Sequence, residues 1–299
     1  MSDLFPGFSA STIPVGDPGE DVSIHCEHGG DGPPLLLLHG APQTHAMWHK
    51  VAQRLAARYT VVCADLRGYG DSGKPAGLPD HANYSKRVMA RDMVRLMQAL
   101  GHERFALVGH DRGGRVAHRL ARDHRDRVTR LCVLDISPTL TMYEQTTMAF
   151  ASAYYHWFFL IQPAPFPETL IGHDPKFYLP WTSGGRHGNA LPFTDKRAIA
   201  EYERCFCDPA AIHGHCEDYR AAAGIDLEHD RADLTEKIRC PMLALWGERG
   251  VVHRLFHPLD DWRAVADDVR GKPLPAGHFI AEEVPERLLA ELLPFLAGG

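Results

Sequence analysis

Long apolar runs, long basic runs, internal repeats and low-complexity segments are all missing from this chain of 299 residues. No apolar stretch reaches the ~20 residues that a transmembrane helix needs, so the sequence predicts no membrane span. Lysine and arginine number 32 against 38 acidic residues, and the net charge of −6 gives no indication of a nucleic acid or membrane partner. The first residues lack the charged-then-apolar pattern of a signal peptide, so we expect a cytoplasmic protein.

Cysteine is scarce, and its placement does not indicate a disulfide framework. Seven cysteines, an odd number, are scattered along the chain, which suits a reducing compartment. One local group of thiols and imidazoles could be drawn as a metal site: Cys205, Cys207, His213, His215 and Cys216. Its spacing matches none of the usual paired-ligand patterns, so we expect packing thiols and surface histidines there, with no metal and no cofactor.

Short apolar runs alternate with helical patterns along the chain. The runs are typical of buried parallel strands and occupy residues 35–38, 59–64, 105–108, 128–136 and 241–247. Between the second and third runs, Met89, Met93, Leu96 and Leu100 recur at the spacing of an amphipathic helix. This alternation predicts a parallel sheet with active residues at the carboxyl ends of its strands.

The run at 105–108 turns into a helix over the string G-H-D-R-G-G-R at 109–115, with Asp111 at its tip. A strand–turn–helix over G-x-D-x-G is typical of the nucleophile elbow of α/β hydrolases, with aspartate where serine is usual. Gly109 and Gly113 permit the close backbone approach that this turn requires. The sequence therefore predicts the α/β-hydrolase fold, a mostly parallel eight-stranded sheet flanked by helices with a helical cap after strand 6.

The composition changes between residues 138 and 223. Prolines and aromatic residues are dense in this segment, and no strand pattern occurs in it. We interpret 138–223 as the helical cap, and 1–137 and 224–299 as the two parts of the core domain.

Three residues stand in the order of a catalytic triad at predicted strand ends: Asp111, Asp135 and His278. His278 lies in a G-H-F string just before the last helix, where this fold places its base. The acid often follows the seventh strand, but Gly250 occupies that position here. Asp135 is therefore the predicted acid, with Glu248 as the alternative.

Aspartate as the nucleophile changes the predicted chemistry. A carboxylate that attacks an sp³ carbon displaces a leaving group and becomes an alkyl ester. His278, oriented by Asp135, would then activate water to hydrolyse the ester, while the backbone N–H groups of Ala41 and Arg112 form the oxyanion hole. A carbon–halogen bond and an epoxide both fit this chemistry.

Two arginines beside the nucleophile favour an acid as the substrate. Arg112 and Arg115 lie three positions apart at the start of a helix, so they share a face. The fork of a guanidinium group matches the two oxygens of a carboxylate. Further along the helix, we expect Arg119 and Arg122 to form surface ion pairs.

At this point the chain resembles the fluoroacetate (haloacetate) dehalogenases over nearly its whole length. The resemblance rests on the strings H-G-A-P-Q-T-H-A-M-W at 39–48, D-L-R-G-Y-G at 65–70, G-H-D-R-G-G-R at 109–115, Y-H-W at 155–157, C-E-D-Y-R at 216–220 and G-H-F at 277–279. It implies hydrolysis of fluoroacetate, or another small haloacetate, to glycolate and halide. It further implies that Arg112 and Arg115 hold the substrate carboxylate, that His156, Trp157 and Tyr219 bind the departing halide, and that the enzyme is a homodimer.

Two positions near the nucleophile need their own interpretation. The resembling family commonly has a bulky aromatic residue where this chain has Ala41, so we expect a roomier pocket that admits substituted 2-haloacids. His110, next to Asp111, is expected to be a pocket-wall residue rather than a second base.

Two alternatives stay open. An epoxide hydrolase would use the same nucleophile and base, with cap tyrosines to protonate the epoxide oxygen, and the candidates are Tyr143, Tyr154, Tyr155 and Tyr178. The two arginines argue against it. The second alternative is a non-catalytic receptor for a small carboxylate, which would have no need of the complete catalytic set.

Overall fold

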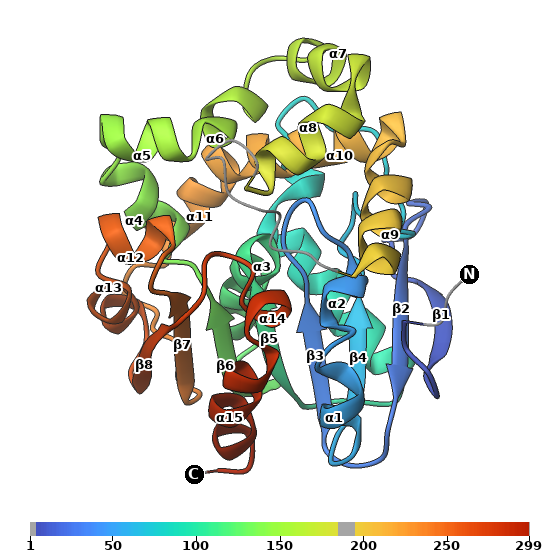
Figure 1. Cartoon of the computed structure of the whole chain (residues 1–299), viewed down its shortest axis with the longest axis vertical. Coiled ribbons are helices and arrows are strands. Elements are labelled where there is room, and N and C mark those ends of the chain that lie inside the picture. The colour runs from blue at the N-terminus through green and yellow to red at the C-terminus, as the bar shows by residue number, and fades with distance from the viewer. Residues whose placement is uncertain (1–3, 185–194, 299) are drawn as a thin grey trace.

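The computed structural model describes residues 4–184 and 195–298, and its centre is one sheet of eight strands (Figure 1). The strands are β1 (Ser9–Pro14), β2 (Ser23–Gly29), β3 (Pro34–Leu38), β4 (Thr60–Ala64), β5 (Phe105–His110), β6 (Val128–Leu134), β7 (Met242–Gly247) and β8 (Val269–Leu274). Their order in the sheet is β1-β2-β4-β3-β5-β6-β7-β8. β2 pairs antiparallel with both of its neighbours, and the remaining pairs are parallel. The predicted mostly parallel eight-stranded sheet is confirmed.

Helices cover both faces of the sheet. α1 (Ala52–Ala56) and α15 (Pro285–Leu296) lie on the face toward the viewer in Figure 1, and α2 (Lys86–Ala99) and α3 (Asp111–Asp123) lie on the far face. The shorter elements of the core are η1 (His45–Trp48), η2 (Ala82–Tyr84), α12 (Val251–Leu255), α13 (Pro258–Val265) and α14 (Ile280–Glu283). Every residue of β5 and β7 is buried, as expected for strands with helices on both sides. Within 4–184 and 195–298, no helix is long and apolar enough to cross a membrane.

The chain between β6 and β7 is helical wherever it has regular structure in the described residues. Its helices are α4 (Thr139–Glu144), α5 (Met148–Ala153), α6 (Tyr155–Leu160), α7 (Phe166–His173), α8 (Pro175–Thr182), α9 (Lys196–Phe206), α10 (Pro209–Ala223) and α11 (Ile225–Ala232). Figure 1 shows α5 to α10 gathered over the end of the sheet toward which the β3 and β6 arrows point. Catalytic residues at the carboxyl ends of the strands therefore face these helices.

The charges of α11, the helix after residue 223, contact both the core and the cap, where its Arg231 lies 3.5 Å from Glu144 of α4. Asp230 of α11 forms an ion pair with Arg119 of α3 at 2.6 Å and lies 3.6 Å from Arg122. The bounds 138–223 for the cap therefore stay a prediction. The expectation that Arg119 and Arg122 form surface ion pairs is wrong, because α11 and the following turn bury both arginines.

Candidate active site

The nucleophile elbow forms where β5 meets α3. The strand ends at His110 and the helix begins at Asp111, whose φ of +45° is unusual for a residue with a side chain. A Cβ on Gly113 would lie 2.4 Å from the carbonyl oxygen of His39, and one on Gly109 would lie 2.5 Å from that of Gly113. Both positions therefore require glycine, and the turn places the Asp111 side chain on the wall of a cavity.

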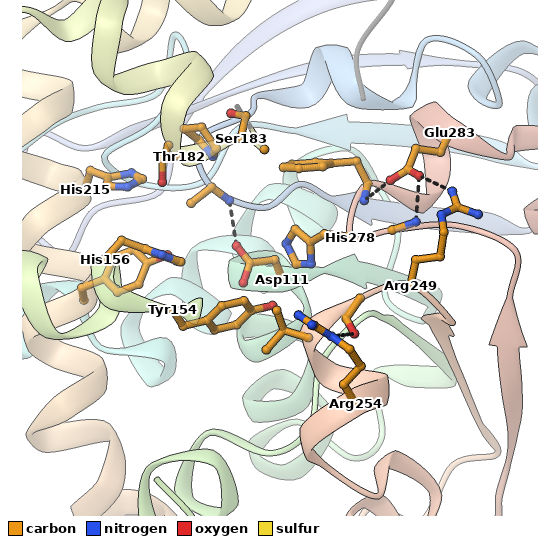
Figure 2. A pocket seen from close by; sticks show the side chains of 18 residues that line it. Asp111, Tyr154, His156, Thr182, Ser183, His215, Arg249, Arg254, His278 and Glu283 are labelled. Carbon is orange, nitrogen blue, oxygen red and sulfur yellow. Dashed lines mark hydrogen bonds and ion pairs between the residues drawn. The ribbon is translucent and has the colours of Figure 1, made fainter. Parts of the chain in front are cut away.

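The cavity has a volume of about 600 Å³ and lies between the strand ends and the cap (Figure 2). Its lining residues are Ala41, Pro42, Asp111, Tyr154, His156, Thr182, Ser183, Gly184, His215, Tyr219, Arg249, Gly250, Val251, Arg254, Gly277, His278, Phe279 and Glu283. Core and cap segments far apart in the sequence thus enclose a single space around Asp111.

Asp111 is ionised in this environment. Its side chain is only 5% exposed, and burial by itself would raise the pKa of the carboxyl group. The charges of His278, Arg115 and Arg112 outweigh that effect and lower the pKa to about 2. One carboxylate oxygen, Oδ2, accepts a hydrogen bond of 3.1 Å from the backbone N–H of Ala41. A buried carboxylate held ionised by cations is well suited to act as a nucleophile.

His278 is oriented by a carboxylate at the end of the neighbouring strand. Asp135 directly follows β6 and has a φ of +51°. Its Oδ2 lies 2.6 Å from Nδ1 of His278, and its Oδ1 accepts a 2.9 Å hydrogen bond from the backbone N–H of Gly247. Burial lowers the pKa of His278, but the hydrogen bond and charge of Asp135, with the charge of Asp111, raise it above its ordinary value. The alternative acid, Glu248, is exposed to solvent.

His110 lies behind His278 and does not line the cavity, so the expectation of a pocket-wall residue is wrong. Its Nε2 donates a 2.8 Å hydrogen bond to the backbone carbonyl of His278, and the two rings are 4.6 Å apart between centroids. Burial and the nearby His278 lower the pKa of His110 to about 3, so its imidazole is neutral at physiological pH. A neutral, hydrogen-bonded ring of this kind supports the backbone beside the base.

The two arginines of α3 are both buried, but they are held differently. Arg112 donates from Nε and Nη2 to the two carboxylate oxygens of Asp218, each at 2.8 Å. Arg115 donates to uncharged groups, the Thr139 hydroxyl at 2.9 Å and the Ser137 carbonyl at 3.3 Å. Within the described part of the chain, Nη1 of Arg112 and Nε of Arg115 have no hydrogen-bond partner. Neither arginine is among the residues that line the cavity, and an anion bound beside them would give both buried donors a partner.

The cap contributes three side chains that can donate hydrogen bonds. His156 and Trp157 lie on α6 and Tyr219 lies on α10. The Tyr219 ring is 5.9 Å from that of His156 and 6.4 Å from that of Trp157 between centroids. Burial and the charge of Asp111 raise the pKa of Tyr219 well above its ordinary value, so the phenol keeps its proton. His156 and Tyr219 line the cavity, and Trp157 is buried beside them.

Cation–π contacts join these cap residues to the arginines. The guanidinium carbon of Arg112 lies 4.1 Å from the centroid of the Tyr219 ring, and that of Arg115 lies 4.6 Å from the centroid of Trp157. The predicted carboxylate-binding and halide-binding residues therefore form one connected group. Sequence reasoning gave no role to Asp218, which fixes Arg112, although it directly precedes Tyr219 in the C-E-D-Y-R string.

The cysteines and histidines between 205 and 216, where we expected no metal, do not cluster with one another as ligands in the described residues. All seven cysteines lie in the described segments and are free. In 4–184 and 195–298, the groups with ligand atoms close enough for a metal are His25–His45–Asp65 and Glu168–His213–Glu217. In the second group, Arg220 lies 2.6 Å from Glu168 and 2.8 Å from Glu217. The guanidinium therefore balances the charge of the two carboxylates without a metal ion. His215 instead lines the cavity, where burial lowers its pKa to about 4.

Comparison with known proteins places this fold in one class. A family model described as the alpha/beta hydrolase fold matches residues 33–281. The chain therefore belongs to the α/β-hydrolase fold family.

Individual relatives are more informative than the family as a whole. A fluoroacetate dehalogenase from Burkholderia sp. is 50% identical, covering 99% of this chain and 97% of the relative. A soluble epoxide hydrolase from Corynebacterium sp. (strain C12) is 35% identical, covering 92% of this chain and 93% of the relative. The crystal structure of a protein from Nostoc sp. PCC 7120, described as an α/β hydrolase, has a TM-score of 0.92 at 53% identity, covering 98% of this chain and 99% of that one.

Proposed function

We propose that this protein is a dehalogenase that hydrolyses small 2-haloacids, converting fluoroacetate and water to glycolate and fluoride. The observation that carries the proposal is an ionised Asp111 beside Arg112 and Arg115, each of which has a buried donor without a partner in the described residues. The 50% identity to the Burkholderia fluoroacetate dehalogenase supports the same activity. No cofactor is needed for the steps below.

In the first step, the Asp111 carboxylate attacks the halogen-bearing carbon. A carbon–oxygen bond forms as the carbon–halogen bond breaks, and the halide leaves with the bonding electron pair. Arg112 and Arg115 hold the substrate carboxylate and so orient the carbon. His156, Trp157 and Tyr219 donate hydrogen bonds to the departing halide, on which negative charge develops.

In the second step, water hydrolyses the ester on Asp111. Esterification removes the Asp111 charge, which is one of the charges that raise the pKa of His278. His278 then loses its proton more readily and acts as the base toward water, while Asp135 keeps its orientation. The tetrahedral oxyanion is held by the backbone N–H groups of Ala41 and Arg112, and the 3.1 Å bond from Ala41 to Asp111 Oδ2 is consistent with this role.

The epoxide hydrolase alternative keeps some support. Tyr154 and Tyr219 line the cavity near Asp111 and could protonate an epoxide oxygen, and the Corynebacterium relative is 35% identical. Tyr143 and Tyr178 do not line the cavity. An epoxide gives the buried Arg112 and Arg115 no anion to bind, so we favour the haloacid.

Halide release tests the proposal directly. Fluoride release from fluoroacetate is measured with an ion electrode for the wild type and for Asp111→Asn, with chloroacetate in parallel. We expect release that falls by roughly four orders of magnitude in Asp111→Asn and is retained in the exposed control Asp260→Asn. Epoxide turnover without halide release would establish the epoxide hydrolase instead, and binding of fluoroacetate without turnover would establish the receptor.

We also propose that the protein is a cytoplasmic homodimer. Free thiols at all seven cysteines suit a reducing compartment. Exposed apolar surface favours association with a second copy, and four large apolar side chains are exposed on α7 and α8: Phe166, Leu170, Phe177 and Trp181. Light scattering after size-exclusion chromatography tests this proposal, and a monomeric mass would overturn it.

A further inference from the structure

One wall of the cavity has no part in the reaction proposed above. It is built by the loop after β7 and by α12, and it contributes Arg249, Gly250, Val251 and Arg254. In Figure 2, the Arg254 side chain extends from α12 toward the part of the cavity that holds Asp111. Haloacetate has one carboxylate, and Arg112 and Arg115 already account for it. Arg249 and Arg254, the two cations of this wall, therefore have no role in binding haloacetate.

The two arginines of this wall are not equivalent. Arg249 is engaged, since its Nη2 lies 3.1 Å from Glu283 and its Nη1 donates to the Pro275 carbonyl at 2.7 Å. Arg254 makes one long hydrogen bond, 3.4 Å from Nε to the carbonyl of Gly250. Among residues 4–184 and 195–298, no carboxylate lies within ion-pair distance of Arg254. Arg254 is exposed to solvent and also lines the cavity, so its charge is available to an anion there.

Beside the rings of Tyr154 and His278, the cavity lining includes residues with small side chains or none. Ala41 lines the cavity and its N–H bonds to Asp111, so a small side chain lies beside the reacting carboxylate. Gly250 and Gly277 also line the cavity, next to Arg249 and His278 in the sequence. A substituent on the reacting carbon can therefore extend away from the arginines of α3 without meeting a bulky side chain from these three positions.

Resting on the proposed function, we propose that the site accepts 2-halodicarboxylic acids, whose second carboxylate binds Arg254. The C1 carboxylate occupies the site at Arg112 and Arg115, and Asp111 attacks C2. With 2-chlorosuccinate, the Asp111 oxygen bonds to C2 while chloride leaves with the electron pair. Water, deprotonated by His278, then hydrolyses the ester. The net reaction consumes one water and yields 2-hydroxysuccinate, chloride and one proton.

Two substrates of the same shape measure the contribution of the second carboxylate to turnover. The first is 2-chlorosuccinate, and the second is its C4 amide, which is isosteric but uncharged at the distal end. Chloride release gives kcat/KM for each, with chloroacetate as the reference substrate. We expect the wild type to prefer the diacid over the amide by about tenfold, the contribution of one charge-assisted hydrogen-bond pair. Arg254→Gln should bring the ratio close to one, and Arg254→Lys should keep part of the preference.

A matched variant controls for net charge. Arg263→Gln removes one positive charge from the exposed face of α13, where Arg263 pairs with Asp260, and the wild-type ratio should persist. Equal loss of preference in Arg254→Gln and Arg263→Gln would reduce the effect to general attraction and overturn the inference. A wild-type ratio of one or less would also overturn it. If chloroacetate is hydrolysed in that case, the dehalogenase function stands and the diacid site alone fails; if it is not, the proposed function itself fails.

Discussion

The core wall and the cap wall of the cavity are held together by different forces. The core wall, Asp111, Asp135 and His278, is fixed by short hydrogen bonds, such as the 2.6 Å contact of His278 with Asp135. The cap wall, His156, Trp157 and Tyr219, is arranged by ring contacts of 5.9 and 6.4 Å. We propose that the core wall carries the groups that form and break covalent bonds, while the cap wall supplies the donors for the leaving ion.

The largest expected effect is the loss of steady-state halide release when the base of the core wall is removed. His278→Asn removes the base but leaves Asp111 able to attack, so an ester should accumulate on Asp111. Steady-state halide release should fall by roughly four orders of magnitude, after a burst of one halide per site. Intact-protein mass spectrometry should show the mass of one carboxymethyl group added from chloroacetate.

The trapped ester also separates the competing functions. A receptor that only binds carboxylates would show no added mass. An ester that forms equally in His278→Asn and Asp111→Asn would contradict the assignment of Asp111 as the nucleophile.

The next expected effect is on stability, and it concerns the ion pair between Asp218 of α10 and Arg112 of α3, which joins the cap to the core. Asp218 lies on α10, and its carboxylate binds both Arg112 of α3 and Lys86 of α2. Asp218→Asn leaves buried cations without their counterion, and we expect a loss of about 3 kcal/mol in the free energy of unfolding. Urea denaturation measures it, with the exposed Asp260→Asn as the control, expected within about 1 kcal/mol of the wild type.

The same contact should be sensitive to acid. Arg112 and Lys86 overcome burial and hold the pKa of Asp218 well below its ordinary value. A carboxyl group with a lowered folded-state pKa contributes stability at neutral pH, and that contribution is lost as the pH falls. The difference between the wild type and Asp218→Asn should therefore shrink on acidification. A difference that is constant with pH would contradict the ion pair.

The contrast between the walls also explains what the sequence could predict. Asp111, Asp135 and His278 follow strands in a fixed order, so alternating apolar runs and short strings were enough to find them. His156 and Trp157 lie on α6 and Tyr219 lies on α10, where no periodicity distinguishes a donor from a packing residue. They could be named only through resemblance to a family.

The missed residues have physical reasons as well. Arg119 and Arg122 were expected on the surface because charged residues along a helix usually face water. Their partners Asp230 and Asp233 lie more than a hundred positions later, on and just after α11. Asp218 was missed for the same reason, since only the folded chain brings it to Arg112. Long-range pairing of charges leaves no local pattern in the sequence.

A smaller effect tests the cap wall alone. Trp157→Phe keeps an aromatic ring against Arg115 but removes the indole N–H. If that group stabilises the departing ion, kcat on fluoroacetate should fall by roughly a hundredfold. The loss on chloroacetate should be smaller, because chloride is less basic and needs hydrogen bonds less. Equal losses on both substrates in parallel halide assays would indicate a packing role for Trp157.

The smallest expected effect is a shift in pH dependence from within the core wall. Asp111 is esterified during this step and has no proton to titrate, so a change of ester hydrolysis with pH near neutrality belongs to His278. His278 must be neutral to act as a base, and the rate of ester hydrolysis should therefore rise with pH through the pKa of His278 and then level off.

Glu283 accepts hydrogen bonds from the backbone N–H groups on both sides of His278, at Gly277 and Phe279, and its charge helps to raise the pKa of His278. Glu283→Gln keeps an acceptor but removes the charge, so the midpoint should move to lower pH, measured as the single-turnover rate of ester hydrolysis against pH. The exposed Glu286→Gln should keep the wild-type midpoint, and a shift of equal size in that variant would mean that the base responds to net charge and not to the carboxylate beside it.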